Sequence, residues 1–171
     1  LIVNLSQLSL AKIASVIGNP NTEEIYFEVN KDTKNYPASL TKIMTLYIIF
    51  DEIKLGKLSL NDQIKFSKYA TLQQPSKLNI DVNDSITLDE AINALIVKSA
   101  NDVAVAVAEK ISGSEKKFVK KMNNYAKRLK LDNTNFANPH GLPNKSNLSS
   151  AYDMFLLSSK LVREYPEYLN R

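Results

Sequence analysis

The run of apolar residues between positions 40 and 55 constrains the fold of this chain more than any other feature. Its large side chains recur at helical spacing, and Gly56 follows where a helix is expected to end. They cover almost the whole circumference of that helix and comprise Leu40, Ile43, Met44, Tyr47, Ile48 and Leu55. A helix that is apolar all round is stable inside a protein, so the sequence predicts a central, buried helix at about residues 39–55.

A hairpin and several further helices are predicted around this central helix. Two β-rich runs flank the turn residues Gly18, Asn19 and Pro20 and indicate a hairpin at about residues 11–30. Because an isolated pair of strands is only marginally stable, this hairpin is expected to need partner strands. The 171 residues are interpreted as a single α+β domain. Later helices are expected at residues 88–98, 102–111, 115–130 and about 149–164.

The composition excludes several classes of function. The net charge of +4 comes from 22 Lys and Arg residues scattered among 18 Asp and Glu residues, without the basic and aromatic clustering that binds nucleic acid. Cysteine is absent, which excludes disulfide and thiol chemistry, and the single histidine excludes a zinc site of several imidazoles. The longest apolar run is shorter than the roughly 20 residues that cross a bilayer. The chain starts without Met, which fits either a trimmed N-terminus or the end of an export signal.

Ser39 and Lys42 are the candidate catalytic pair. Residues at positions i and i+3 share a helix face, so the spacing predicts a hydroxyl and an amine within hydrogen-bond reach. A lysine acts as a base only when its pKa is lowered, and the apolar neighbours and the positive end of the helix dipole are both expected to lower it. A helix start also presents free backbone N–H groups, as an oxyanion hole requires. The pattern therefore predicts a serine nucleophile with a lysine base.

The same spacing also has a purely structural interpretation. It recurs at Ser9 with Lys12 and at Ser114 with Lys117, and Ser114 precedes a charged amphipathic helix as an N-cap does. Only Ser39 combines a nearby proline, a helix start and apolar surroundings. That combination favours the catalytic interpretation at this one position.

A second polar cluster, "KSAND" at residues 98–102, lies between two predicted apolar helices. A hydroxyl at Ser99 is able to relay a proton, and the amide of Asn101 is able to hold a substrate carbonyl or the lysine. The alternative is that one of these side chains caps the following helix. The Ser-x-Asn spacing also arises at Ser59 and Asn61. Taken alone, the cluster favours the cap.

Three segments together resemble the low-molecular-mass penicillin-binding proteins, the serine D-alanyl-D-alanine carboxypeptidases. They are "PASLTKIMT" at residues 37–45, "VKSANDVAVAVAE" at residues 97–109 and "FANPHGL" at residues 136–142. The resemblance implies an α+β fold of the serine β-lactamase and DD-peptidase type. In that fold an antiparallel sheet with flanking helices is joined to a helical subdomain.

The motifs of that family imply roles for four residues. Its Ser-x-x-Lys motif matches Ser39 with Lys42, and its Ser-x-Asn motif matches Ser99 with Asn101. The resemblance implies that Ser39 attacks the last peptide bond of a peptidoglycan stem peptide ending in D-Ala-D-Ala. Lys42 would then be the base, Ser99 the proton relay and Asn101 a substrate-positioning group, with no metal or cofactor. The resemblance further implies that β-lactam antibiotics acylate Ser39 and that the protein works outside the cytoplasm, in the periplasm or cell envelope.

The third motif of the family, Lys-Thr-Gly, does not occur in the 171 residues. In the family it lies on a strand that binds the terminal carboxylate of the substrate and supplies a second oxyanion donor. We therefore expect this chain to lack the C-terminal strands of the fold. Association with a membrane surface is an open possibility, through a C-terminal region that these residues do not include. Turnover by the chain alone is expected to be impaired.

Two other functions are alternatives to that of a carboxypeptidase. One is a non-catalytic domain that binds cell-wall peptide or a partner protein. The other is a class A β-lactamase, which uses a glutamate acting through water. The glutamates after Asn101 all fall on predicted helices or the tail, and they are Glu109, Glu115, Glu164 and Glu167. A structural role is favoured for His140, and Asp153 is interpreted as a charge in the first turn of the last helix.

Overall fold

The computed structural model describes residues 13–168, so the pair Ser9 and Lys12 and the first ten residues lie outside the described part. Two antiparallel strand pairs are present: β1 (Ser15–Gly18) with β2 (Ile25–Val29), and β3 (Gln63–Lys65) with β4 (Ser85–Thr87). The α-helices are α1 (Thr41–Lys54), α2 (Lys68–Thr71), α3 (Leu88–Asn93), α4 (Asn101–Ser112), α5 (Glu115–Arg128) and α6 (Ala151–Glu164). Short 3-10 turns cover Ala38–Leu40 and Pro166–Tyr168, and a π-helical turn covers Ala94–Lys98.

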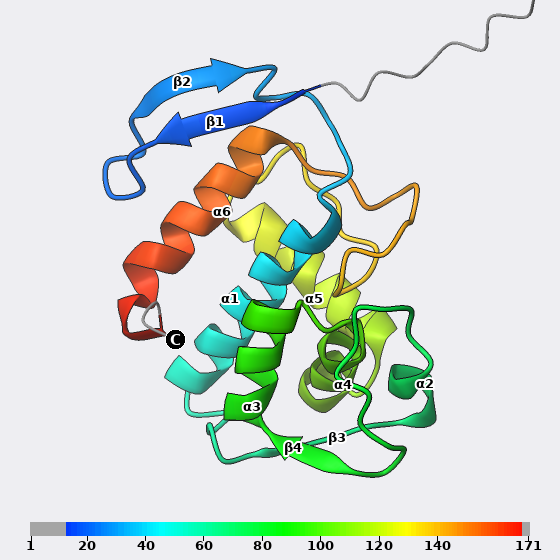
Figure 1. The fold of residues 1–171 in the computed structure, drawn as a ribbon. Helices are drawn as coiled ribbons and strands as arrows, with labels where there is room; N and C mark the ends of the chain where they lie inside the picture. Colours follow the sequence, from blue (N-terminus) through cyan, green and yellow to red (C-terminus); the bar gives the residue numbers. More distant parts are fainter. Residues whose placement is uncertain (1–12, 169–171) are drawn as a thin grey trace, which may run out of the picture.

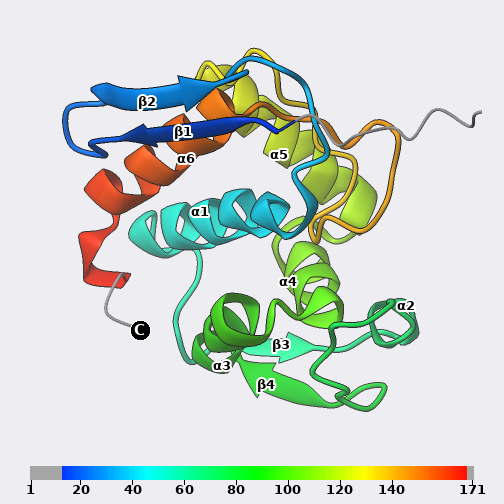
Figure 2. The same ribbon diagram turned by 45° about the horizontal axis from the view of Figure 1, so that its top comes forward.

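Helix α1 runs through the middle of the fold, as its apolar sequence predicts (Figures 1 and 2). Helices α4, α5 and α6 all pack against it. The side chains of Met44, Ile48 and Ile49 are fully buried, and removing a side chain of that size from water is worth about 2 kcal/mol. The helix predicted at about residues 39–55 is α-helical from Thr41 to Lys54, and a 3-10 turn precedes it. Ala38 opens that turn in a left-handed conformation, with φ at 47°.

Side-chain caps fix where the other helices begin. Thr87 and Glu90 form the predicted capping box of α3, in which each side chain accepts the backbone N–H of the other. The Ser114 hydroxyl accepts the Lys117 N–H at the start of α5, which confirms the N-cap interpretation there. Ser150 caps α6 in the same way.

The long loop between α5 and α6 folds back against the N-terminal half of the chain. Its end pairs with the segment before α1 through a β-bridge between Asn35 and Ser149. Asp153 lies in the first turn of α6 as predicted, but its carboxylate is buried. It accepts hydrogen bonds from the Asn133 N–H and the Thr134 hydroxyl, so it also fastens the start of this loop.

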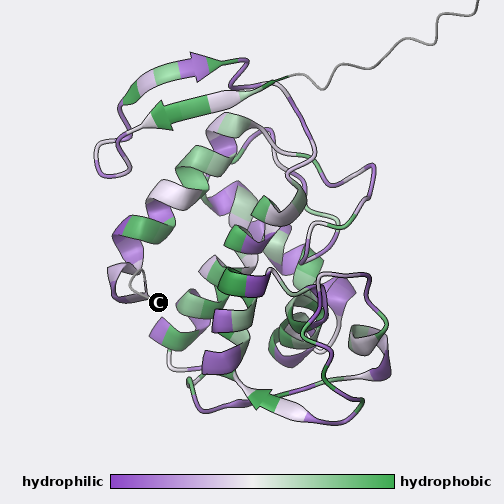
Figure 3. Ribbon diagram, in the orientation of Figure 1, coloured by the Kyte–Doolittle hydropathy of each residue, from purple (hydrophilic) through white to green (hydrophobic). Residues whose placement is uncertain are grey.

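The hairpin of β1 and β2 lies against α6 and carries an apolar outer face (Figure 1). Ile17 stands opposite Phe27 in the register, and these two side chains are 59% and 53% exposed. Figure 3 shows β1 as largely hydrophobic. Within residues 13–168, β1 and β2 pair only with each other. In the same part of the chain, no helix has the length and apolar character needed to cross a membrane.

Candidate active site

Ser39 is exposed at the middle of the 3-10 turn that leads into α1. The turn is closed by a hydrogen bond of 3.0 Å from the Leu40 N–H to the Pro37 carbonyl. The N–H of Ser39 itself has no hydrogen-bond acceptor within residues 13–168. A free N–H beside a serine hydroxyl is the donor that an oxyanion hole requires, so the turn fits the expected role of this residue.

Lys42 lies in the first turn of α1, and its side chain is buried. Its amine donates to the side-chain oxygen of Asn101 at 2.8 Å and to the backbone carbonyl oxygen of His140 at 2.6 Å. Burial lowers its pKa from 10.5 to about 8, in the direction that the apolar neighbours predict. The expected direct hydrogen bond between Ser39 and Lys42 is absent among the described residues, because both acceptors draw the amine toward the protein interior.

Asn101 bridges two parts of the site. Its side-chain oxygen accepts from Lys42, and its side-chain nitrogen donates to the Gln74 carbonyl at 2.9 Å in the loop after α2. The alternative that Ser99 or Asn101 caps α4 is wrong. Ala100 occupies the N-cap position, and no side chain accepts a hydrogen bond there.

Ser99 ends the π-helical turn that follows α3, in a left-handed conformation with φ at 54°. The helix predicted at residues 88–98 is therefore α-helical only to Asn93. This turn brings Ser99 to the wall of a pocket of about 500 Å³ that Ser39 and Lys42 also line. The other walls are mostly aliphatic and include Leu40, Ile43, Leu46, Leu95 and Ile96.

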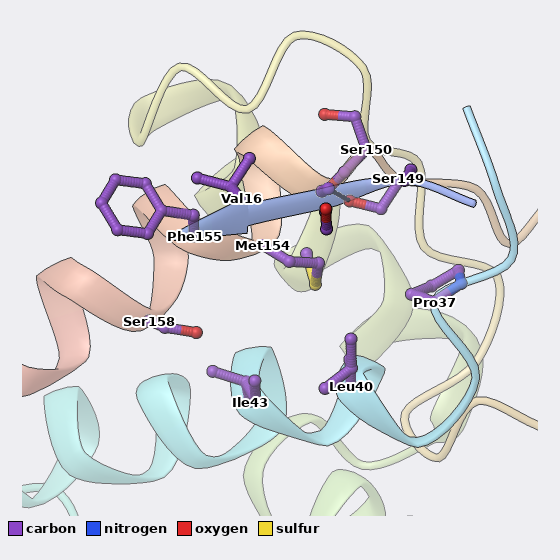
Figure 4. Close-up of a pocket in the computed structure, with 12 residues that line it drawn as sticks. Val16, Pro37, Leu40, Ile43, Ser149, Ser150, Met154, Phe155 and Ser158 are labelled. Carbon is purple, nitrogen blue, oxygen red and sulfur yellow. Dashed lines mark hydrogen bonds between the residues drawn. The ribbon is translucent and has the colours of Figure 1, made fainter. Parts of the chain in front are cut away.

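A second pocket lies on the other side of the same helix start, between β1, α1 and α6 (Figure 4). It measures about 420 Å³ and shares Pro37, Leu40 and Ile43 with the first pocket. Val16 of β1 and Met154 and Phe155 of α6 also line this pocket, and in Figure 4 the side chain of Met154 extends toward Leu40 and Pro37. This pocket lacks Ser39, Lys42 and Ser99, so we place the chemistry in the first pocket.

Residues 138–142 pack directly on the start of α1. The Thr45 hydroxyl donates to the Pro139 carbonyl at 2.7 Å, one helical turn from the contact between Lys42 and His140. A Cβ atom added to Gly141 would lie 1.8 Å from the Ala38 carbonyl oxygen, and Gly141 has φ at +89°. Only glycine fits this contact. The sequence signalled a turn here, but it did not reveal that the turn reaches the lysine.

Asp102 fastens the loop after α2 to the site, a role that the sequence did not reveal. Its fully buried carboxylate accepts the N–H groups of Leu78 and Asn79. The Asn101 N–H donates to the Ser76 carbonyl in the same loop. Among residues 13–168, no three His, Cys, Asp or Glu side chains are grouped to hold a metal ion.

Comparisons with known proteins agree with the geometry. A model of the Peptidase_S11 family, described as D-alanyl-D-alanine carboxypeptidase, matches residues 3–171. The D-alanyl-D-alanine carboxypeptidase DacF of Bacillus subtilis is 37% identical over 158 residues, which are 92% of this chain and 41% of that protein.

Solved structures give the same likeness. The D-alanyl-D-alanine carboxypeptidase DacD from Francisella tularensis is 36% identical with a TM-score of 0.89, over 98% of this chain and 40% of that one. Penicillin-binding protein D2 from Listeria monocytogenes, in its cefotaxime-bound form, is 31% identical with a TM-score of 0.81, over 92% of this chain and 64% of that one. The chain therefore spans about two fifths of the length of the first two relatives.

Proposed function

This chain belongs to the Peptidase_S11 family of D-alanyl-D-alanine carboxypeptidases, and from that premise we propose that it carries the nucleophile and base of a serine carboxypeptidase. Its fold is the DD-peptidase fold, as the sequence predicts. The proposed substrate is a peptidoglycan stem peptide that ends in D-Ala-D-Ala. The observation that carries the proposal is the buried amine of Lys42, held by Asn101 in a pocket shared with Ser39 and Ser99.

The proposed reaction starts with proton transfer from the Ser39 hydroxyl to the neutral amine of Lys42. The serine oxygen then bonds to the carbonyl carbon of the penultimate residue, and the Ser39 N–H stabilises the resulting oxyanion. The proton passes through the Ser99 hydroxyl to the leaving nitrogen, the C–N bond breaks, and D-alanine departs. Water hydrolyses the acyl ester on Ser39. Catalytic hydrogen bonds often tighten only when the substrate binds, so the inward position of Lys42 in the free protein is compatible with this role.

The proposal also accounts for what this stretch of chain does not supply. A Lys-Thr-Gly sequence is absent from residues 1–171. The second oxyanion donor and the carboxylate anchor, which this motif supplies in the family, are therefore absent as well. One such donor is worth about 3 to 4 kcal/mol of transition-state stabilisation. We therefore propose that the chain alone turns over far more slowly than full-length relatives, and that further strands cover the exposed face of Ile17 and Phe27 in a complete enzyme.

Two measurements test this function. Release of D-alanine from a diacyl-D-Ala-D-Ala peptide is expected from the natural protein that contains this chain, and only weakly from residues 1–171. Mass spectrometry after incubation with penicillin is expected to find the adduct on Ser39. No release by the natural protein would favour the non-catalytic binding domain, and release of bound penicillin within seconds would favour a β-lactamase.

The proposed partners follow from the same chemistry. Cefotaxime and ampicillin are bound in structures of the Listeria relative, and we propose that β-lactams acylate Ser39 here. The substrate class places the protein outside the cytoplasm, where peptidoglycan lies. Contact with a membrane surface would come from a segment other than residues 13–168, in which no helix is suited to spanning a bilayer.

A further inference from the structure

His140 is a buried side chain to which the proposed reaction gives no role. It is 5% exposed, and its ring lines a pocket of about 430 Å³ together with Tyr69, Gln73 and Glu115. That pocket is separate from the one that Ser39, Lys42 and Ser99 line. His140 therefore lines a different pocket from the one that holds the proposed chemistry, while its carbonyl oxygen accepts a hydrogen bond from Lys42.

The hydrogen bond at Nδ1 determines which ring nitrogen of His140 carries the proton. The Leu142 N–H donates to Nδ1 at 3.0 Å, so Nδ1 carries a lone pair and the ring proton of a neutral imidazole lies on Nε2. Nε2 faces a carboxylate oxygen of Glu115 at 3.6 Å, and that carboxylate also accepts the Tyr69 hydroxyl. Burial, together with the charge of Lys42, lowers the pKa of His140 to about 4, so the ring is neutral at physiological pH. The ring is thus hydrogen-bonded at Nδ1, and its Nε2 edge faces the Glu115 carboxylate.

The hydrogen bond that fixes the ring also fixes the conformation of the backbone around it. The acceptor at Nδ1 closes the turn from residue 140 to residue 142, and the Asn138 side chain accepts the Gly141 N–H at 2.6 Å. This turn aims the His140 carbonyl at the amine of Lys42 and presses Gly141 against Ala38, the residue before the proposed nucleophile. The position of the ring is therefore coupled, through this turn, to the positions of Lys42 and Ser39.

We propose that the His140 side chain is a positioning residue for the lysine base: its Nδ1 acceptor shapes the 140–142 turn so that the His140 carbonyl oxygen holds the amine of Lys42. Glu115 supports this by orienting the Nε2 edge of the ring. The role rests on the proposed function, because it matters for activity only if Lys42 is the base. It differs from a catalytic role, since among residues 13–168 the ring forms no hydrogen bond with Lys42 or Ser39.

Two variants of His140 separate positioning from space filling. In His140→Asn, the side-chain oxygen takes the place of Nδ1 and is able to accept the Leu142 N–H. In His140→Leu, a similar volume is filled without any acceptor. In the natural protein that contains this chain, we expect the asparagine variant to be acylated by fluorescent penicillin within threefold of the wild-type rate. We expect the leucine variant to be at least tenfold slower, in the acylation step and not in the initial binding of penicillin. Equal rates for the two variants would overturn the proposal.

The pKa of Lys42, measured by NMR titration, gives a second readout that needs no activity. In His140→Leu the turn is expected to move the carbonyl oxygen of residue 140 away from the amine. Because this acceptor stabilises the ammonium form, the pKa of Lys42 is expected to fall by about 0.5 or more. It is expected to stay at the wild-type value in His140→Asn. An unchanged or higher pKa in the leucine variant contradicts the positioning role. If the pKa moves as expected but penicillin does not label Ser39, the proposed function fails and the positioning role stands.

Glu115→Gln keeps the proposal testable if His140→Leu does not fold. This change removes the charge that faces Nε2 and keeps the shape of the side chain. Acylation is expected to slow at least threefold in the wild-type background and to be unaffected in the His140→Asn background, where no Nε2 remains. An equal effect of Glu115→Gln in both backgrounds would show that Glu115 does not act through the ring.

Discussion

The amine of Lys42 donates to the backbone carbonyl oxygen of His140 at 2.6 Å, across 98 positions of sequence. The same amine donates to the side chain of Asn101. Two segments that are distant in the chain therefore fix the position of one buried side chain on the central helix.

Replacing Ser39 with alanine is expected to abolish covalent labelling by penicillin, because the oxygen that forms the ester is removed. Ser114→Ala is the matched control, since Ser114 also precedes a lysine by three residues but only caps α5. The control is expected to keep the label and to lose about 1 kcal/mol of unfolding free energy, as for other N-caps. Labelling that survives in Ser39→Ala disproves the role of this serine.

The acylation rate is expected to depend on pH through Lys42. Its pKa is about 8, and only the neutral amine accepts a proton. The rate should therefore rise about tenfold per pH unit below pH 8 and level off above it. Stopped-flow measurement with fluorescent penicillin gives this profile. Lys42→Arg is the control, because a guanidinium stays charged and should be inactive at every pH. A rate that is flat between pH 6 and pH 8 excludes Lys42 as the base.

Asn101→Ala is expected to impair both activity and stability. The change removes an acceptor of the Lys42 amine and a donor to the Gln74 carbonyl. Leaving such groups unpaired costs about 1 to 3 kcal/mol of unfolding free energy, and acylation should slow at least tenfold. Asn93→Ala on the exposed side of α3 is the control and should match the wild type in both assays. Urea unfolding and penicillin acylation measure the two effects.

Gly141→Ala is expected to displace the turn that carries Ser39. The new methyl group would lie 1.8 Å from the Ala38 carbonyl oxygen, in addition to the strain of a positive φ. Gly56→Ala is the matched control, because Gly56 also has a positive φ but has no atom within 4 Å of an added Cβ. The control should lose about 1 kcal/mol of unfolding free energy. Gly141→Ala should lose about 3 kcal/mol and most of its penicillin labelling. Equal losses in both variants would mean that the contact with Ala38 is unimportant.

The stability of the protein is expected to fall between pH 6.5 and pH 4 because of His140. The folded protein keeps this ring neutral down to about pH 4, whereas the unfolded chain protonates it near pH 6.5. The unfolded state therefore binds more protons in this window, and the free energy of unfolding decreases as the pH falls. The loss attributable to His140 is on the order of 2 kcal/mol.

The control for this pH dependence is His140→Asn, which lacks the titrating ring but keeps the neighbouring Lys42 and Glu115. The difference between wild type and variant, measured by urea unfolding at each pH, should shrink or reverse as the pH falls through this window. A difference that is independent of pH shows that the ring protonates equally in the folded and unfolded states.

The helices and their caps were predictable because their signals are local. The apolar positions of α1 recur within a few turns, and the capping boxes and N-caps at Thr87 and Ser114 involve residues three apart. The 3-10 turn before α1 was not predicted, because the positive φ of Ala38 lies where Gly141, distant in the sequence, packs against it. The preference for a capping role at Ser99 and Asn101 was wrong for a similar reason, since the partners of Asn101 lie on α1 and on the loop after α2.

The sequence by itself was enough to identify the family and to predict the candidate site residues, namely Ser39, Lys42, Ser99 and Asn101. Only the tertiary structure decided how deeply Lys42 is buried, which lowers its pKa, and which groups hold its amine. The two acceptors of that amine lie 59 and 98 positions away in the sequence, so they could not be identified from local patterns. The spacing of residues along a helix determines which side chains share a face. The residues that pack against that face depend on the tertiary structure.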